Sequence, residues 1–77
     1  MKKIYEKYIV TYTYDHYLGG SEYFDNIDEA KDFAINKIMK NDALCGRSYR
    51  LVKMTYEKNI FGNCKNVEIT EIDSWCE

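Results

Sequence analysis

Hydrophobic and polar residues alternate along the first third of the chain. Residues 4–14 are β-branched or aromatic with few exceptions, which is typical of a long strand. Because side chains alternate between the two faces of a strand, one face collects the residues that we expect to reach the core: Tyr8, Val10, Tyr12 and Tyr14. Gly19 and Gly20 can adopt the positive φ of a hairpin loop, which predicts a turn there and a short return strand over residues 21–24.

The periodicity then lengthens to that of a helix. Apolar residues fall on one helical stripe: Ile27, Ala30, Ala34 and Ile38. Asn26 is the predicted N-cap, and Glu29 three residues later completes a capping-box spacing. We therefore expect an amphipathic helix of about 14 residues, whose two small alanines let it lie close to a sheet.

Two further alternating segments, residues 49–56 and 67–72, predict strands separated by a turn at Gly62. The pattern β-β-α-β-β predicts one α+β domain over residues 1–77: a small antiparallel sheet of about four strands, in the order 2-1-3-4, with the amphipathic helix on one face. One helix cannot cover both faces of such a sheet. We expect the second face to be either wet or covered by a partner.

Composition and charge narrow the range of functions. Hydrophobic residues make up 45% of the chain, which favours a globular domain, and the net charge of −2 disfavours non-specific binding to nucleic acid. The N-terminal segment lacks the apolar core of a signal peptide, and no apolar run reaches the roughly 20 residues of a membrane span. We expect a cytoplasmic protein with no membrane association.

Candidate chemistry is sparse. The single histidine, His16, falls in the predicted turn without a nucleophile and an orienting group beside it in the sequence. Three cysteines, Cys45, Cys64 and Cys76, lack the close pairing of zinc ligands and are odd in number, so we expect thiols. Neither Gly-rich phosphate-binding loop is present. The sequence predicts no catalytic residue, metal or cofactor, and hence a protein that is not an enzyme.

Tyrosine is the residue type that points to binding, because it offers a large contact area at low conformational-entropy cost. Three tyrosines around the predicted turn are hard to bury in a small core and form the expected contact patch: Tyr14, Tyr17 and Tyr23. Five carboxylates are the expected phosphate-like charges at a partner surface: Asp25, Asp28, Glu68, Glu71 and Asp73.

Two alternatives remain open at this point. The third predicted strand and its exit interleave basic residues with Tyr49 and Tyr56, a pattern found in single-strand nucleic-acid binders; the basic residues are Arg47, Arg50, Lys53 and Lys58. Such a chain would be a small nucleic-acid-binding or regulatory protein. The other alternative is a structural homodimer whose open sheet face pairs with itself.

Four features of the chain occur together: its length, its β-β-α-β-β pattern, its lack of a catalytic signature, and a lysine-rich composition that A/T-rich codons would encode. In these features the chain resembles the small orphan proteins of bacteriophages and mobile elements. Anti-CRISPR proteins are among them. The resemblance is one of type over the whole chain and transfers no residue role. It implies a stoichiometric inhibitor, working in the cytoplasm of a bacterial host, that occludes a nucleic-acid-binding surface of a defence nuclease such as a CRISPR effector.

Overall fold

The computed structural model describes residues 3–15, 17–58, 61–62 and 64–77. Its strands are β1 (Lys3–Tyr14), β2 (Leu18–Phe24), β3 (Ser48–Lys58) and β4 (Cys64–Cys76), and its helix α1 (Ile27–Phe33) continues into a π-helical segment, η1 (Ala34–Met39). The strands form one antiparallel sheet in the order β2-β1-β3-β4. The predicted α+β fold and the predicted strand order are both confirmed.

The helix starts where the sequence predicts. The side-chain oxygen of Asn26 accepts a hydrogen bond of 2.8 Å from the backbone N–H of Glu29, which satisfies one of the donors left free at a helix start. The predicted apolar stripe then meets the sheet in one cluster of buried side chains: Val10, Ala30, Ala34, Ile38, Tyr49 and Leu51. This cluster defines the helix-covered face of the sheet.

The register of the strands defines the opposite face, which we call the open face. Residues paired across neighbouring strands point to the same side, and successive residues of one strand point to opposite sides. Since Val10 pairs with Leu51 below the helix, the pairs on either side of it, Ile9 with Val52 and Thr11 with Arg50, project from the open face.

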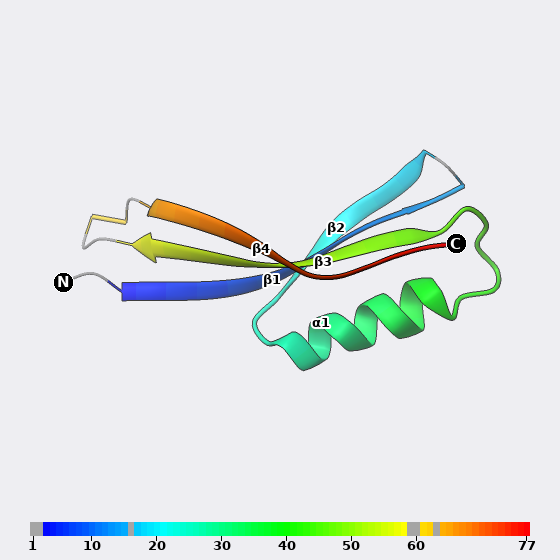
Figure 1. Cartoon of the computed structure of the whole chain (residues 1–77), viewed down its shortest axis with the longest axis horizontal. Helices are drawn as coiled ribbons and strands as arrows, with labels where there is room; N and C mark the ends of the chain where they lie inside the picture. The colour runs from blue at the N-terminus through cyan, green and yellow to red at the C-terminus, as the bar shows by residue number, and fades with distance from the viewer. Residues whose placement is uncertain (1–2, 16, 59–60, 63) are drawn as a thin grey trace.

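Part of the sheet has none of the described helical residues against it. Figure 1 shows β1, β3 and β4 continuing well past α1 toward the end of the molecule that carries the N-terminus. We call this extension, residues 3–7, 54–58 and 64–69, the arm. β2 does not reach it, because its pairing with β1 ends at Tyr8 and Phe24. The chain therefore has a Cα radius of gyration of 14.4 Å, against about 12 Å for a compact domain of this length.

The strand ends depart from prediction because two irregularities break the alternation of β4. The register shifts between Leu51 and Val52, which leaves Ile72 as an extra residue on β4, and shifts again between Thr55 and Glu57. Such bulges interrupt the two-residue period without ending the hydrogen-bonded ladder. β4 thus begins before, and ends after, the predicted segment 67–72, and β3 similarly exceeds 49–56.

The prediction that Gly19 and Gly20 form the hairpin turn is wrong, because both lie within β2. The positive φ of that connection belongs to Asp15, at 50°. Gly19 is needed for a close approach instead, since a Cβ there would lie 2.2 Å from the carbonyl oxygen of Tyr12. The predicted turn at Gly62 is confirmed by its φ of 83°.

Candidate partner-binding surface

The open face carries a continuous group of apolar side chains that crosses all the strands. Tyr23 pairs with Ile9 and Ile9 with Val52, while on the arm Met54 pairs with Ile69. Tyr23 and Ile69 are 64% and 63% exposed. Together these residues form what we call the open-face patch: Tyr5, Ile9, Tyr23, Val52, Met54, Tyr56 and Ile69.

Two tyrosines give the patch a rigid end on the arm. Tyr5 and Tyr56 pair across β1 and β3, and their rings stack with centroids 5.5 Å apart. Stacked rings lose little side-chain freedom when a partner covers them, because each ring already restrains the other. The patch thus combines half-buried aliphatic groups with preordered aromatic ones.

Two ion pairs flank the patch. Lys7 donates to Asp25, and this hydrogen bond raises the pKa of the Lys7 ammonium. On the other side, the Nε of Arg50 lies 3.1 Å from a carboxylate oxygen of Glu71. These two cations therefore each have an anion beside them, whereas Lys3 and Lys58, at the arm end of the same face, form no ion pair with another described residue.

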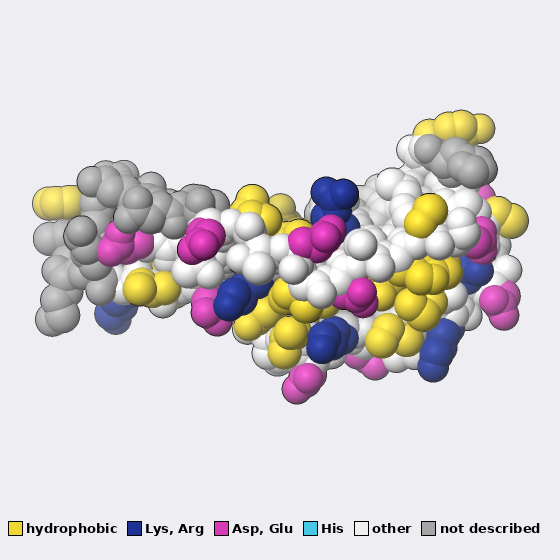
Figure 2. All heavy atoms as spheres, in the orientation of Figure 1, with side chains coloured by type: hydrophobic (Ala, Val, Ile, Leu, Met, Phe, Trp, Pro, Cys, Tyr) yellow, Lys and Arg dark blue, Asp and Glu magenta, His cyan; other side chains and the backbone are white. Residues whose placement is uncertain are grey.

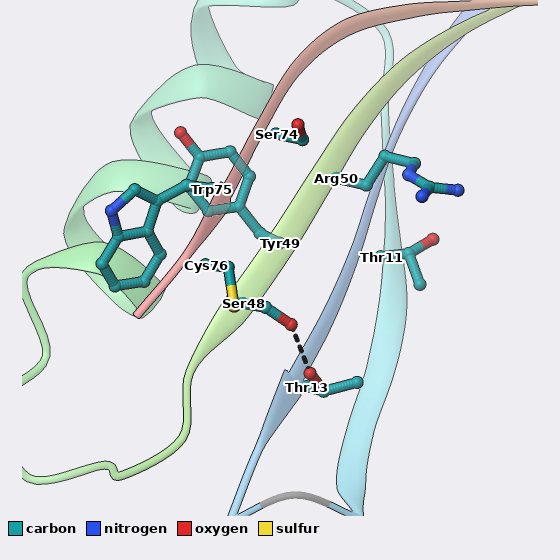
Figure 3. A pocket seen from close by; sticks show the side chains of 8 residues that line it. All are labelled: Thr11, Thr13, Ser48, Tyr49, Arg50, Ser74, Trp75 and Cys76. Atoms are coloured by element: carbon teal, nitrogen blue, oxygen red, sulfur yellow. Dashed lines mark hydrogen bonds between the residues drawn. The ribbon is translucent and has the colours of Figure 1, made fainter.

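A hollow of about 480 Å³ lies at the end of the sheet opposite the arm. Figure 3 shows Arg50, Thr11 and Thr13 on one side of β3, and Tyr49 and Trp75 on the helix side. The other lining residues are Ser48, Ser74 and Cys76, and the hydroxyl groups of Thr13 and Ser48 are hydrogen-bonded to each other. These groups can hydrogen-bond an anionic or hydroxylated ligand, but none is a histidine or a carboxylate that would act as a general base.

The three tyrosines predicted to form a contact patch do not share a surface. Tyr23 belongs to the open-face patch, whereas Tyr17 lies in the β1–β2 connection and is 87% exposed. Tyr14 projects to the helix-covered side and stacks on Tyr12 with centroids 6.4 Å apart. Of the three, Tyr23 is the exposed one that pairs with an apolar residue of the open face, Ile9.

The five predicted carboxylates are also divided. Asp25 and Glu71 flank the open-face patch in the ion pairs described above. Asp73 is on the helix side, where it accepts a 2.8 Å hydrogen bond from the hydroxyl of Tyr49. Burial and this hydrogen bond raise the pKa of Tyr49 to about 12. Asp28 and Glu68 are exposed and make no ion pair within the described part of the chain.

Sequence reasoning missed the role of Arg47, which it placed among basic surface residues. Arg47 is only 9% exposed. Its guanidinium donates to the backbone oxygens of Met39 and Asn41 at 2.8 Å each, binds the Glu77 carboxylate through Nε and Nη2, and lies 5.5 Å from the Trp75 ring centroid. It thus joins the end of η1 to the end of β4.

Two of the remaining cations of β3 are engaged, because Arg50 pairs with Glu71 and the Nζ of Lys53 lies 3.7 Å from a carboxylate oxygen of Glu6. Lys58 is exposed and forms no ion pair with another described residue. Tyr49, the aromatic residue between Arg47 and Arg50, is buried under the helix. Tyr56 and Lys58 instead share the parity of Val52 on the open face, so the predicted basic and aromatic residues of this strand are divided between the two faces of the sheet.

Cys45 and Cys76 are exposed free thiols, whereas His16 and the side chain of Cys64 lie outside the described part of the structure. Among described residues, no three His, Cys, Asp or Glu side chains converge as metal ligands would. The described helical residues include no segment with the length and hydropathy needed to span a membrane.

Comparison with protein families, curated proteins and solved structures finds no match for this chain.

Proposed function

We propose that this chain is a non-enzymatic protein-binding module that docks on its partner through the open-face patch. The observation that carries this proposal is the patch itself, an apolar surface crossing four strands with no helix or strand of the described residues over it. A contiguous patch of exposed apolar groups on a small domain is typical of an interaction surface. Tyr23 is its aromatic anchor, and Ile69 extends the contact onto the arm.

In its specific form, the proposal is a phage-type inhibitor that occludes a nucleic-acid-binding surface of a host defence nuclease in the bacterial cytoplasm. The support is the resemblance in type together with exposed carboxylates that have no ion-pair partner in the described chain, Asp28 and Glu68. Such carboxylates can take positions that phosphates occupy on a basic surface. The patch would supply contact area on the open face, and the carboxylates would supply charge on the opposite side of the sheet.

The experiment is capture of partners by the tagged chain from lysates of bacteria that express CRISPR effectors and other defence systems. A nuclease recovered at stoichiometric level is then purified and assayed for DNA cleavage with and without the chain. Tyr23→Ala should weaken binding at least tenfold, as expected for an exposed aromatic anchor. Tyr17→Ala is the matched control, because it removes an even more exposed ring that lies off the patch.

Capture of no protein, or equal loss of binding for both variants, would refute docking through the open-face patch. Binding lost only with Tyr17→Ala would place the contact at the hairpin tip instead. Inhibition that persists in the absence of physical association would contradict occlusion as the mechanism.

A homodimer is the second candidate, favoured by the two ion pairs that flank the patch. Because Lys7 with Asp25 and Arg50 with Glu71 neutralise each other, a second copy could cover the part of the patch between them without opposing like charges. Sedimentation equilibrium over a wide concentration range tests this. A mass that rises to that of a dimer, and returns to that of a monomer in Ile69→Lys, would support it; a constant monomer mass would eliminate it.

A further inference from the structure

A second concave surface lies on the opposite side of the sheet from the open-face patch. It is a groove of about 450 Å³ between α1 and β2, lined by Phe24, Asp28, Glu29, Asp32, Phe33 and Lys37. The rings of Phe24 and Phe33 lie 5.4 Å apart at an angle of 46° and provide its apolar lining. We call it the helix groove.

The lining of the helix groove is rigid. Phe33 is held between Phe24 and Tyr12, whose ring centroid lies 5.5 Å away, and both phenylalanines pack against the buried cluster under the helix. Aromatic side chains fixed in this way provide a preformed contact for one inserted side chain, because little conformational freedom remains to be lost on binding.

The charge of the groove is the second feature. Three carboxylates and one lysine line it. None of the three carboxylates, Asp28, Glu29 and Asp32, forms an ion pair with another described residue. Asp32 accepts a hydrogen bond from the side-chain amide of Asn36, which leaves its charge uncompensated. The carboxylates at the open-face patch, in contrast, each face a cation.

An apolar pocket with unpaired carboxylates at its edge selects for an apolar side chain flanked by positive charges. We infer that the helix groove binds a cationic segment of a partner protein that inserts one aromatic or large aliphatic residue between flanking lysines or arginines. The inference rests on the proposed function, in which the partner offers a basic surface, and it assigns to Asp28 and its neighbours the contact with that surface.

This inference extends what the sequence predicts for Asp28. The sequence explains the acidic residues of the first helical turn by the partial positive charge of a helix N-terminus. That explanation accounts for the charges but not for the adjacent exposed edge of two phenylalanine rings. The groove joins both features in one surface.

The test is a titration of the purified, uniformly ¹⁵N-labelled chain with a synthetic blocked peptide, Lys-Arg-Phe-Lys-Arg, followed by NMR. A second peptide with Ala in place of Phe keeps the charge and removes the anchor. We expect saturable shifts of the amides that line the groove, and binding at least fivefold weaker for the Ala peptide. A dilution series of the free chain, followed by the same amide shifts, shows whether a second copy occupies the groove.

Charge variants complete the test. Asp28→Asn with Asp32→Asn removes two groove charges and should weaken the Phe peptide about fivefold. Glu6→Gln with Glu68→Gln removes two charges from the arm and should leave the affinity unchanged. Both variants must first retain the amide spectrum of the folded chain.

Three outcomes would overturn the inference: equal affinity for the two peptides, shifts spread over the arm and β4 rather than the groove, or groove shifts caused by self-association. Absence of binding would also overturn it. Because the titration uses the isolated chain, its result is independent of the partner capture. If Tyr23→Ala no longer captures the partner protein but still binds the Phe peptide, the helix groove and the open-face patch are two separate binding surfaces.

Discussion

Arg47 is the residue whose replacement tests the packing most directly. Arg47→Met keeps the length of the side chain and its apolar stem but removes every hydrogen-bond donor. The bonds to the oxygens of Met39 and Asn41 are both 2.8 Å long and come from a side chain that is 10% exposed. The Met39 oxygen is at the end of the helical segment, where backbone acceptors have no partner within the helix, and the Asn41 oxygen lies just beyond it, where it also accepts from the Leu44 N–H.

The magnitude follows from these two contacts. A hydrogen bond from a charged donor contributes about 1.5–3 kcal/mol, and partial hydration of the freed oxygens lowers the sum. We expect Arg47→Met to lower the free energy of unfolding by about 2–4 kcal/mol, a large share of the roughly 3–5 kcal/mol available to a domain of this size. The melting temperature should fall by about 10–25 °C.

The assay is urea unfolding followed by circular dichroism, with linear extrapolation to water. Arg50→Met is the matched control, because Arg50 is exposed and its ion pair with Glu71 is worth less than about 1 kcal/mol. If Arg47→Met unfolds the chain outright, Arg47→Lys retains the charge and should give an intermediate midpoint. Equal, small losses for Arg47→Met and Arg50→Met would refute the structural role of Arg47.

The same contact gives a dependence on pH. The Arg47 guanidinium and the backbone N–H of Gly46 lower the pKa of the Glu77 carboxyl below its ordinary value of 4.5. A carboxyl with a lowered pKa in the folded state stabilises the fold fully above its unfolded pKa, and that contribution disappears as pH falls through the folded value. Thermal unfolding between neutral pH and pH values below 4.5 should therefore show a loss of stability that is smaller in Glu77→Gln; an identical pH profile for the two chains would contradict this.

Two further predictions concern the sheet. In an alkaline titration monitored by phenolate absorbance, one tyrosine should ionise only near pH 12, and this step should be missing in Tyr49→Phe. The free energy of unfolding should fall between pH 10 and 12, because the folded state keeps the Tyr49 proton in its hydrogen bond to Asp73 while the unfolded state releases it. Titration of all tyrosines near pH 10 would refute this prediction. Gly19→Ala should destabilise the chain more than Gly20→Ala in the same urea assay, because its Cβ would lie 2.2 Å from the backbone oxygen of Tyr12, while that of Gly20 would lie 3.2 Å from the Tyr12 side-chain hydroxyl; the reverse order would refute the account of Gly19.

The helix and the strand order were predictable because both depend on local patterns. The Asn26 cap and the apolar stripe through Ala30 and Ala34 are readable from spacing alone, and short connections limit the possible orders of four antiparallel strands. The same holds for the core face of β1, where Val10 is fully buried as alternation predicts.

The surface was less predictable, because it depends on register and on where each strand ends. Nothing in the local sequence distinguishes the buried Arg47 from the exposed Arg50; the difference arises because the pairing of Tyr49 with Trp75 brings Glu77 beside Arg47. Likewise, Tyr14 and Tyr23 look equivalent in composition, but the cross-strand register turns them to opposite faces. For Tyr14 the alternation itself was a usable signal, because Tyr14 is four residues after Val10 and therefore lies on the same face of β1.

The strand order also has a consequence for how the chain folds. β1 with β2, and β3 with β4, are pairs of strands that follow each other along the chain, so each hairpin can close over a short loop. The central pairing of β1 with β3 instead joins Lys3 to Lys58 and Thr13 to Ser48 across the whole intervening helix. Closing that long loop carries the largest entropy loss. Folding should therefore be limited by the meeting of two preformed hairpins, and substitutions along the β1–β3 seam should slow folding more than equally destabilising ones at either outer edge.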